Sequence, residues 1–222
     1  MEADLVIKGG HVVDERDAVR AGLAVTDGVI VAVADEAALP PAREVVDAAG
    51  LHLLPGVIDD HVHFREPGMA HKETWATGSA AAAAGGVTTV FEMPNTDPPV
   101  DTVAHLDAKR ACAAPASLVD YGLYGLLGEH NLDQLEPLAE AGVVGFKLFL
   151  GNTTGNLPCP NDGAVREGFE ILARLGLRCA IHAENSPMLF WREARLQAAG
   201  RDDARAHLDA RDDLVAVEAL NR

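Results

Sequence analysis

Two histidines, His61 and His63, lie one residue apart at the end of an apolar segment. Successive side chains of a β-strand point to opposite faces, so both imidazoles share a face if residues 57–63 form a strand. Neutral imidazole nitrogens are common zinc ligands, and the pair could therefore hold a divalent metal. A His-x-His pair in a strand is more often incidental. Here, however, a loop rich in glycine and proline follows at once, and Arg65 continues the same face, as at the strand ends that form α/β-barrel active sites.

A single lysine, Lys147, stands in the otherwise apolar segment 145–150. A buried lysine charge is costly without a compensating partner. One interpretation is an edge strand that leaves Lys147 in water. The other is a carboxylated lysine, in which CO2 added to the neutral amine gives a carbamate whose two oxygens bridge two metal ions. The bare sequence leaves both interpretations open.

His182 lies near the end of another apolar segment, residues 178–184. For a lone histidine, the ordinary interpretation is a hydrogen-bonded residue of the core. Its position favours a different role, because His61, His63, Lys147 and His182 all fall at or near the C-terminal ends of predicted strands. In a (β/α)8 barrel those ends converge on one mouth. The sequence therefore predicts that these four residues share one site.

The elements that must position these residues follow an alternating pattern. From residue 55, strand-like segments alternate with helix-like segments, which is typical of parallel βαβ units. Glycines follow several of the predicted helices, as they often do at helix C-termini. The predicted strands cover residues 57–63, 88–93, 118–127, 143–150 and 178–184, and the predicted helices cover residues 71–84, 102–114, 132–141, 163–175, 188–199 and 208–220.

The first part of the chain has a different texture. Residues 4–54 contain short apolar segments separated by glycine-bearing turns, and no helix of convincing length. We therefore expect two domains, a small β layer over residues 1–54 and an α/β domain over residues 55–222. The strands predicted in the β layer cover residues 5–8, 11–13, 23–25, 29–33 and 51–54.

Composition restricts the possible partners. The chain has 18 basic and 34 acidic residues, a formal charge of −16, which argues against nucleic acid and anionic membranes as partners. No segment approaches the apolar length of a membrane span, and the acidic first residues are unlike a signal peptide. The three cysteines are odd in number and lack metal-type spacing, which indicates reduced thiols. We expect a cytoplasmic protein.

Several motifs together carry a resemblance to a known family. In their order and spacing they resemble the dihydroorotases, which are cyclic amidohydrolases of the amidohydrolase superfamily with allantoinase and hydantoinase relatives. The resemblance covers essentially the whole chain. It implies a partial (β/α)8 TIM barrel of about five of the eight βα units, preceded by a small N-terminal β-sandwich. The motifs are HVHFREPG (61–68), HKET (71–74), AAAGGVTT (82–89), MPNT (93–96), GFKLFLG (145–151) and IHAE (181–184).

The resemblance also implies a site with two divalent metal ions, zinc in first place. His61 and His63 would bind the more buried ion, carboxylated Lys147 would bridge both, and His182 would bind the second. Arg65 and Asn95 would hold the substrate carboxylate. A guanidinium grips a carboxylate in a planar fork, and dihydroorotate has a carboxylate where plain hydantoin has none.

The implied activity is hydrolysis or closure of a cyclic amide. The preferred expectation is the interconversion of dihydroorotate and N-carbamoyl-L-aspartate in pyrimidine biosynthesis. The full-length protein would be a homo-oligomer, a dimer or tetramer. Allantoinases typically lack an arginine at the position of Arg65 and have MPLN in place of MPNT. An allantoinase or hydantoinase-like activity and a non-catalytic scaffold relative remain as alternatives, although retention of all four ligands counts against the scaffold.

The chain departs from the family at its end. A further histidine ligand from the sixth strand and a proton-shuttling aspartate from the eighth have no counterpart in it. The general-base aspartate is therefore expected beyond Arg222. We expect the 222 residues to be an N-terminal portion that is inactive by itself.

Overall fold

The computed structural model describes residues 2–151, 153–154 and 157–221. The chain divides into two compact units, Met1–Gly56 and Val57–Arg222. In the described ranges, no helix combines the length and the apolar character needed to cross a bilayer.

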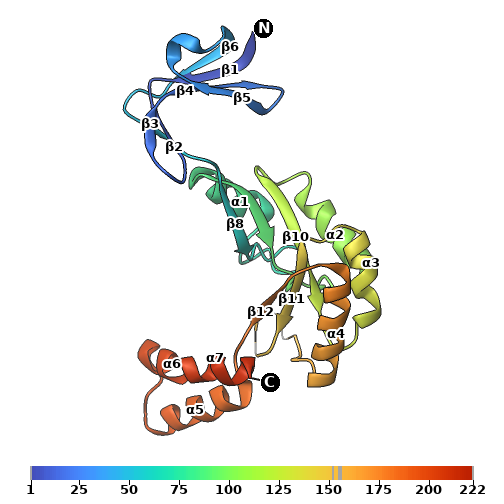
Figure 1. Ribbon diagram of the computed structural model, residues 1–222. Coiled ribbons are helices and arrows are strands. Elements are labelled where there is room, and N and C mark those ends of the chain that lie inside the picture. The colour runs from blue at the N-terminus through green and yellow to red at the C-terminus, as the bar shows by residue number, and fades with distance from the viewer. Residues whose placement is uncertain (1, 152, 155–156, 222) are drawn as a thin grey trace. The chain divides into compact units, whose positions relative to one another are not determined.

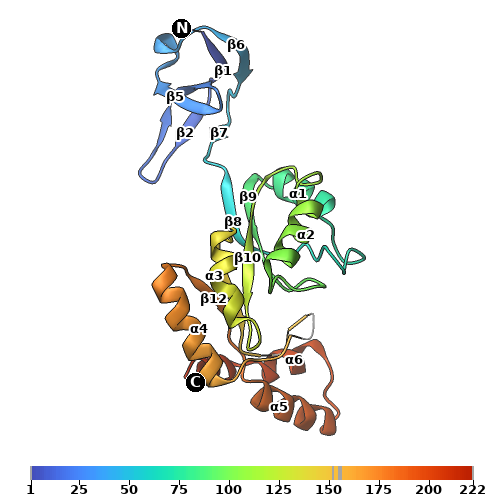
Figure 2. The same cartoon turned by 90° about the vertical axis from the view of Figure 1, so that its right-hand side faces the viewer.

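The N-terminal unit consists of two small sheets (Figure 2). In the larger sheet β1 runs antiparallel to β4 and parallel to β6, and its core contains Ala3, Val6 and Ala24. Two strands, β3 and β6, were not among those predicted, because β3 is short and exposed and charged residues interrupt the apolar pattern of β6. The larger sheet has the order β5-β4-β1-β6 (Val29–Ala34, Gly22–Thr26, Ala3–Lys8, Ala42–Asp47), the smaller the order β3-β2-β7 (Ala18–Arg20, His11–Val13, His52–Leu53), and one 3-10 turn is η1 (Glu36–Ala38).

The second unit is built on a parallel sheet of five strands (Figure 1). Neighbouring strands in the sheet are also neighbours in sequence, as in one part of a TIM barrel. All five predicted strands are present, each within a few residues of the expected bounds. They are β8 (Val57–Val62), β9 (Val87–Glu92), β10 (Asp120–Leu127), β11 (Gly145–Phe149) and β12 (Cys179–His182).

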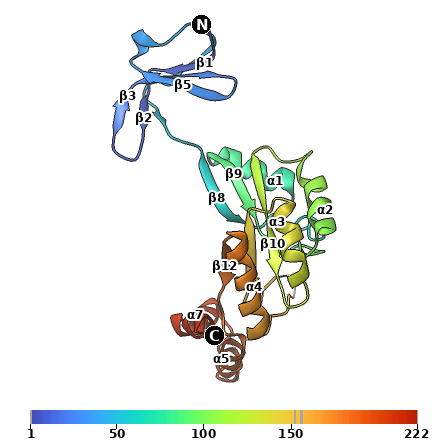
Figure 3. The same ribbon diagram turned by 45° about the vertical axis from the view of Figure 1, so that its right-hand side comes forward.

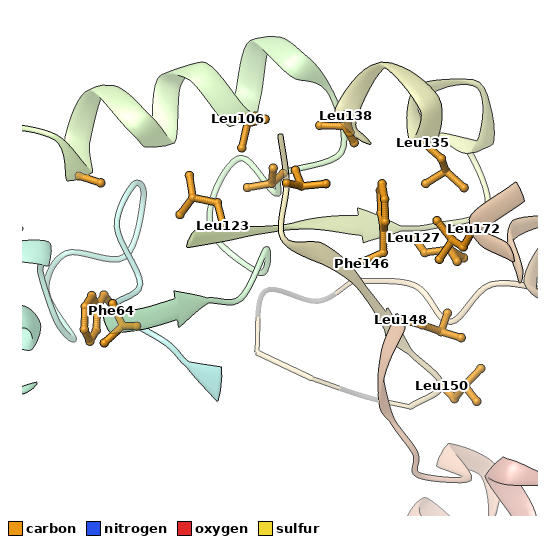
Figure 4. Packing of buried hydrophobic residues seen from close by; sticks show 14 of the residues in the cluster. Phe64, Leu106, Leu123, Leu127, Leu135, Leu138, Phe146, Leu148, Leu150 and Leu172 are labelled. Atoms are coloured by element: carbon orange, nitrogen blue, oxygen red, sulfur yellow. The ribbon is translucent and has the colours of Figure 1, made fainter. Parts of the chain in front are cut away.

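Helices alternate with these strands along the chain (Figure 3). Their apolar side chains are buried in one cluster with those of the sheet. Leu106 and Leu138 from two helices pack in one cluster with Leu123 and Phe146 from two strands (Figure 4). Burial of such side chains is the main stabilising contribution to an α/β layer. These helices are α1 (Trp75–Ala84), α2 (Val103–Ala113), α3 (Leu135–Glu140), preceded by the 3-10 turn η2 (Leu132–Gln134), and α4 (Asp162–Leu175).

Capping side chains set two helix starts that the apolar pattern did not predict. Helix α1 begins at Trp75 rather than at residue 71, because Thr74 forms a capping box with Thr77. The single helix predicted over residues 208–220 is wrong. The side chain of Asp212 accepts a hydrogen bond from the Leu214 N–H and starts a new helix there. The last helices are α5 (Ser186–Ala198), α6 (Ala204–Ala210) and α7 (Asp213–Leu220).

Candidate metal centre

The two histidines of the first motif lie side by side where β8 ends. The ring centres of His61 and His63 are 5.2 Å apart, with the ring planes at 60°. Burial, followed by the positive charge of Arg65, lowers the pKa of His63 to about 4. The His63 imidazole is therefore neutral at pH 7, which is the state that binds a metal. Its Nδ1 atom is buried and makes no hydrogen bond of good geometry among the described residues, although the Asn95 side chain is close enough to oppose the lowering of the His63 pKa.

Lys147 lies in the interior of the sheet. Its strand, β11, is hydrogen-bonded to β10 on one side and to β12 on the other, and Lys147 is only 2% exposed. The edge-strand interpretation, with Lys147 in water, is therefore wrong. Burial lowers the pKa of Lys147, and nearby Cys179 opposes the change. A lowered pKa increases the fraction of the amine that is neutral, which is the form that reacts with CO2.

His182 is the last residue of β12 and lies close to the same part of the sheet. Its ring centre is 6.1 Å from that of Phe149, and its Nε2 atom lies 3.1 Å from a carboxylate oxygen of Glu184. Glu184 also pairs with Arg211 at 3.4 Å. A carboxylate on one ring nitrogen fixes the tautomer of a histidine and makes the other nitrogen a better ligand.

Electrostatic effects connect the two sides of the candidate site. The pKa of His61 is lowered by burial first and then by the charge of Lys147, while Asp60 and Asp59 oppose the change and His182 adds a smaller lowering. Within the part of the chain that the structure describes, no group of three or more His, Cys, Asp or Glu side chains is close enough to hold a metal ion. The four predicted ligands are thus not drawn into one coordination cluster. Their types fit a divalent metal, because the buried Nδ1 of His63 makes no hydrogen bond of good geometry and Lys147 is a buried amine.

Arg65 and Asn95, predicted to bind the substrate, both present polar atoms that lack a protein partner. Arg65 follows the histidine pair with a positive φ of 64°, which turns the chain away from the strand. Its Nη1 atom and the Oδ1 atom of Asn95 are buried without a hydrogen-bond partner in the described ranges. Asn95 is held by a bond from its Nδ2 to the Thr154 carbonyl, at 3.1 Å. Buried polar atoms of this kind are suited to a ligand, since leaving them unpaired is costly.

The sequence did not predict a buried ion pair next to this site, between Glu92 and Lys109. Burial raises the pKa of Glu92 to about 7 and lowers that of Lys109, while each residue opposes the shift of the other. One feature of the sequence could have pointed to Glu92, because it lies at the end of a predicted strand as the predicted ligands do. No feature pointed to Lys109, because a lysine next to Arg110 in a predicted helix looks like an ordinary surface residue.

Comparison with known proteins bears on the fold and on the class of enzyme that this chain resembles. A family model described as dihydro-orotase-like matches residues 50–147. The allantoinase of Solibacter usitatus (strain Ellin6076) is 43% identical over 222 residues, which is 99% of this chain and 48% of that protein. The allantoinase of Deinococcus radiodurans is 39% identical over 224 residues, 100% of this chain and 50% of that protein. The chain thus spans about half the length of the curated relatives it matches.

Solved structures give the same result for the fold. The L-hydantoinase (dihydropyrimidinase) from Arthrobacter aurescens matches with a TM-score of 0.92 at 30% identity, over 99% of this chain and 49% of that one. This chain resembles the cyclic amidohydrolases. A D-hydantoinase structure matches with a TM-score of 0.85 at 28% identity, over 97% of this chain and 48% of that one. The cyclic amidohydrolase resemblance and the partial TIM barrel with a β-sandwich N-terminus are therefore confirmed.

The finer expectation of dihydroorotate receives less support. These similar proteins are named allantoinases and hydantoinases, and the dihydroorotase name enters only through the family model. The comparisons therefore support a cyclic amidohydrolase without selecting one ring.

Proposed function

We propose that this chain is part of a metal-dependent cyclic amidohydrolase, which opens or closes a cyclic amide ring. The observation that carries the proposal is that His61, Lys147 and His182 lie at or near the C-terminal ends of three strands of one parallel sheet. In α/β barrels those ends form the active site. The relatives, whose names describe enzymes acting on small cyclic amides, support the same reaction class.

The four proposed ligands suit two divalent metal ions, of which zinc is the preferred candidate. His61 and His63 would hold one ion, His182 the other, and Lys147, carboxylated by CO2, would bridge them. When bound, the two ions would polarise the ring carbonyl and provide a nucleophile from water at neutral pH. In this chain, burial keeps His63 neutral for this task, and Glu184 would fix the tautomer of His182.

For the substrate, the site itself favours a ring that carries a carboxylate, such as dihydroorotate. The supporting observation is the pair of buried polar atoms, Nη1 of Arg65 and Oδ1 of Asn95, which have no partner in the described part of the chain. A guanidinium binds a carboxylate with good geometry, whereas an uncharged hydantoin ring offers it no anion.

Allantoin is the second candidate, and a different observation favours it. Relatives named allantoinase are 36–43% identical to this chain over nearly its whole length. Allantoin has a five-membered ring and an uncharged ureido substituent in place of a carboxylate. The two candidates therefore differ in charge, which makes them separable by experiment.

The test is a ring-opening assay with the protein expressed at its natural full length. Dihydroorotate, allantoin and hydantoin are each supplied to the metal-free protein and then to the protein with added zinc. We expect turnover only with metal, and the highest kcat/KM for dihydroorotate. If kcat/KM were highest for allantoin, allantoin would replace dihydroorotate as the proposed substrate. A folded protein that opens none of the three rings would contradict the proposed enzymatic activity and favour the alternative of a non-catalytic scaffold.

A further inference from the structure

The buried pair of Glu92 and Lys109 lies directly behind the candidate substrate contacts. Glu92 is the last residue of β9, Lys109 lies on α2, and their side chains are 1% and 0% exposed. A single charge in such a position would be very costly, so burial requires that the two groups compensate each other. The pair is electrically neutral whether the shared proton lies on the nitrogen or on the oxygen.

Each member of the pair makes one further hydrogen bond. Glu92 Oε1 accepts from the backbone N–H of Phe64 at 3.2 Å, and Lys109 Nζ donates to the carbonyl of Met93 at 2.7 Å. Phe64 directly precedes Arg65, and Met93 lies two residues before Asn95. The pair therefore connects the two segments that carry the predicted substrate contacts.

Arg65 is close enough to both members to be affected by their charges. Glu92 raises the pKa of Arg65, and Arg65 lowers the pKa of Lys109. Glu92 is nevertheless engaged by Lys109, and the Nη1 atom of Arg65 keeps no partner among residues with described positions. Because Glu92 and Lys109 together carry no net charge, the positive charge of Arg65 is not cancelled by either of them.

We propose that Lys109 is a positioning residue that engages the Glu92 carboxylate and so keeps the Arg65 guanidinium free for an anionic group on the substrate ring. The inference rests on the proposed function and names a residue outside the substrate contacts on which selection of a ring with a carboxylate or a similar anion depends. Without Lys109, Glu92 would pair with Arg65 instead, because a buried carboxylate takes the nearest cation.

The experiment compares two rings that differ only in the carboxylate, dihydroorotate and dihydrouracil, with the full-length protein. Lys109→Met keeps the length of the side chain and removes its charge. We expect it to raise the KM and the Kd for dihydroorotate by roughly tenfold or more, as for loss of a charged hydrogen bond, with a much smaller change in kcat. Dihydrouracil binding should change by less than about twofold, since no anion is involved.

A second variant separates this role from a merely structural one. In Lys109→Met/Glu92→Gln no carboxylate competes for Arg65, while the Gln amide oxygen still accepts from the Phe64 N–H. We expect the double variant to bind dihydroorotate within about threefold of wild type. Asp107→Asn, which removes an exposed charge from the same helix, is the matched control and should leave both rings unaffected.

The outcomes that overturn the inference are distinct. Equal losses for dihydroorotate and dihydrouracil, or a double variant as impaired as the single one, would indicate packing alone. If Lys109→Met does not fold, Glu92→Gln decides: a roughly tenfold weaker Kd for dihydroorotate would overturn the inference, and an unchanged or tighter one would support it. Calorimetric titration gives Kd without turnover. A wild-type protein that binds dihydroorotate but opens no ring would therefore fail the proposed function while still testing the inference.

Discussion

The amine nitrogen of Lys147 lies 5.4 Å from the centre of the Phe149 ring, on the same strand. The same ring is 6.1 Å from that of His182 on the neighbouring strand. Phe149 therefore joins the two predicted ligands through an apolar surface, which excludes water from the lysine. Exclusion of water favours the neutral amine over the ammonium ion, which is a condition for reaction with CO2.

The first prediction concerns carboxylation of Lys147. Full-length protein equilibrated with 13C-bicarbonate and zinc should show a carbamate carbon signal by NMR, and Lys147→Arg should lack it. In Lys147→Ala, bound zinc should decrease and kcat/KM should fall by roughly a thousandfold or more, because Lewis-acid stabilisation contributes several kcal/mol. Lys72→Ala, at an exposed position, is the control. A fully active protein without the carbamate signal would contradict the prediction.

The second prediction concerns Arg65. Arg65→Ala should lower kcat/KM for dihydroorotate by roughly 1.5–3 kcal/mol, about ten- to 150-fold, the scale of a hydrogen bond to a charged group. Turnover of allantoin should change much less, because its substituent is uncharged. Steady-state kinetics with both rings give the result, with the exposed Arg166→Ala as the control. Unchanged turnover of dihydroorotate would remove the argument for a carboxylate.

The third prediction is a pH dependence of stability that arises from His63. Its folded-state pKa is about 4, below the ordinary value of 6.5, so the unfolded chain binds more protons between these values. Stability of the metal-free protein should therefore fall as the pH decreases through this window, by up to about 3 kcal/mol from this residue. Urea unfolding from pH 7 to pH 4 should show a smaller fall for His63→Asn. The exposed His71→Asn is the control, and a His63→Asn curve parallel to wild type would refute the assignment.

The fourth prediction concerns Gly78, which lies against Phe64 next to the proposed metal ligand His63. A Cβ at Gly78 would lie 2.5 Å from the ring of Phe64, the residue between His63 and Arg65. Gly78→Ala should lower the free energy of unfolding by roughly 1–3 kcal/mol, since the core is overpacked, and should weaken zinc binding. At Gly85, which caps the C-terminus of the same helix, a Cβ would lie 3.5 Å from its nearest atoms, so Gly85→Ala should have little effect. Equal effects of the two substitutions on urea unfolding would show that the Phe64 contact is unimportant.

The order of strands and helices could be predicted because apolar periodicity reports which faces are buried. The same pattern placed His61, Lys147 and His182 at strand ends. It could not decide whether Lys147 is buried, because that depends on which strand lies beside β11. The pairing of Glu92 with Lys109 was equally hidden, since it depends on a helix that crosses the end of β9. The break at Asp212 was missed for a local reason, because its capping hydrogen bond outweighs the apolar pattern that continues across it.

The sequential order of the parallel strands has a consequence for the time course of synthesis. Each of β9 to β12 pairs with the strand made just before it, so the sheet can grow as the chain leaves the ribosome. His61 and His63 emerge first, and the partners Glu92 and Lys109 are both available before the strand of Lys147 exists. The residues around Arg65 can therefore pack on the nascent chain before Lys147 is made, and His182 is the last of the four proposed metal ligands to emerge.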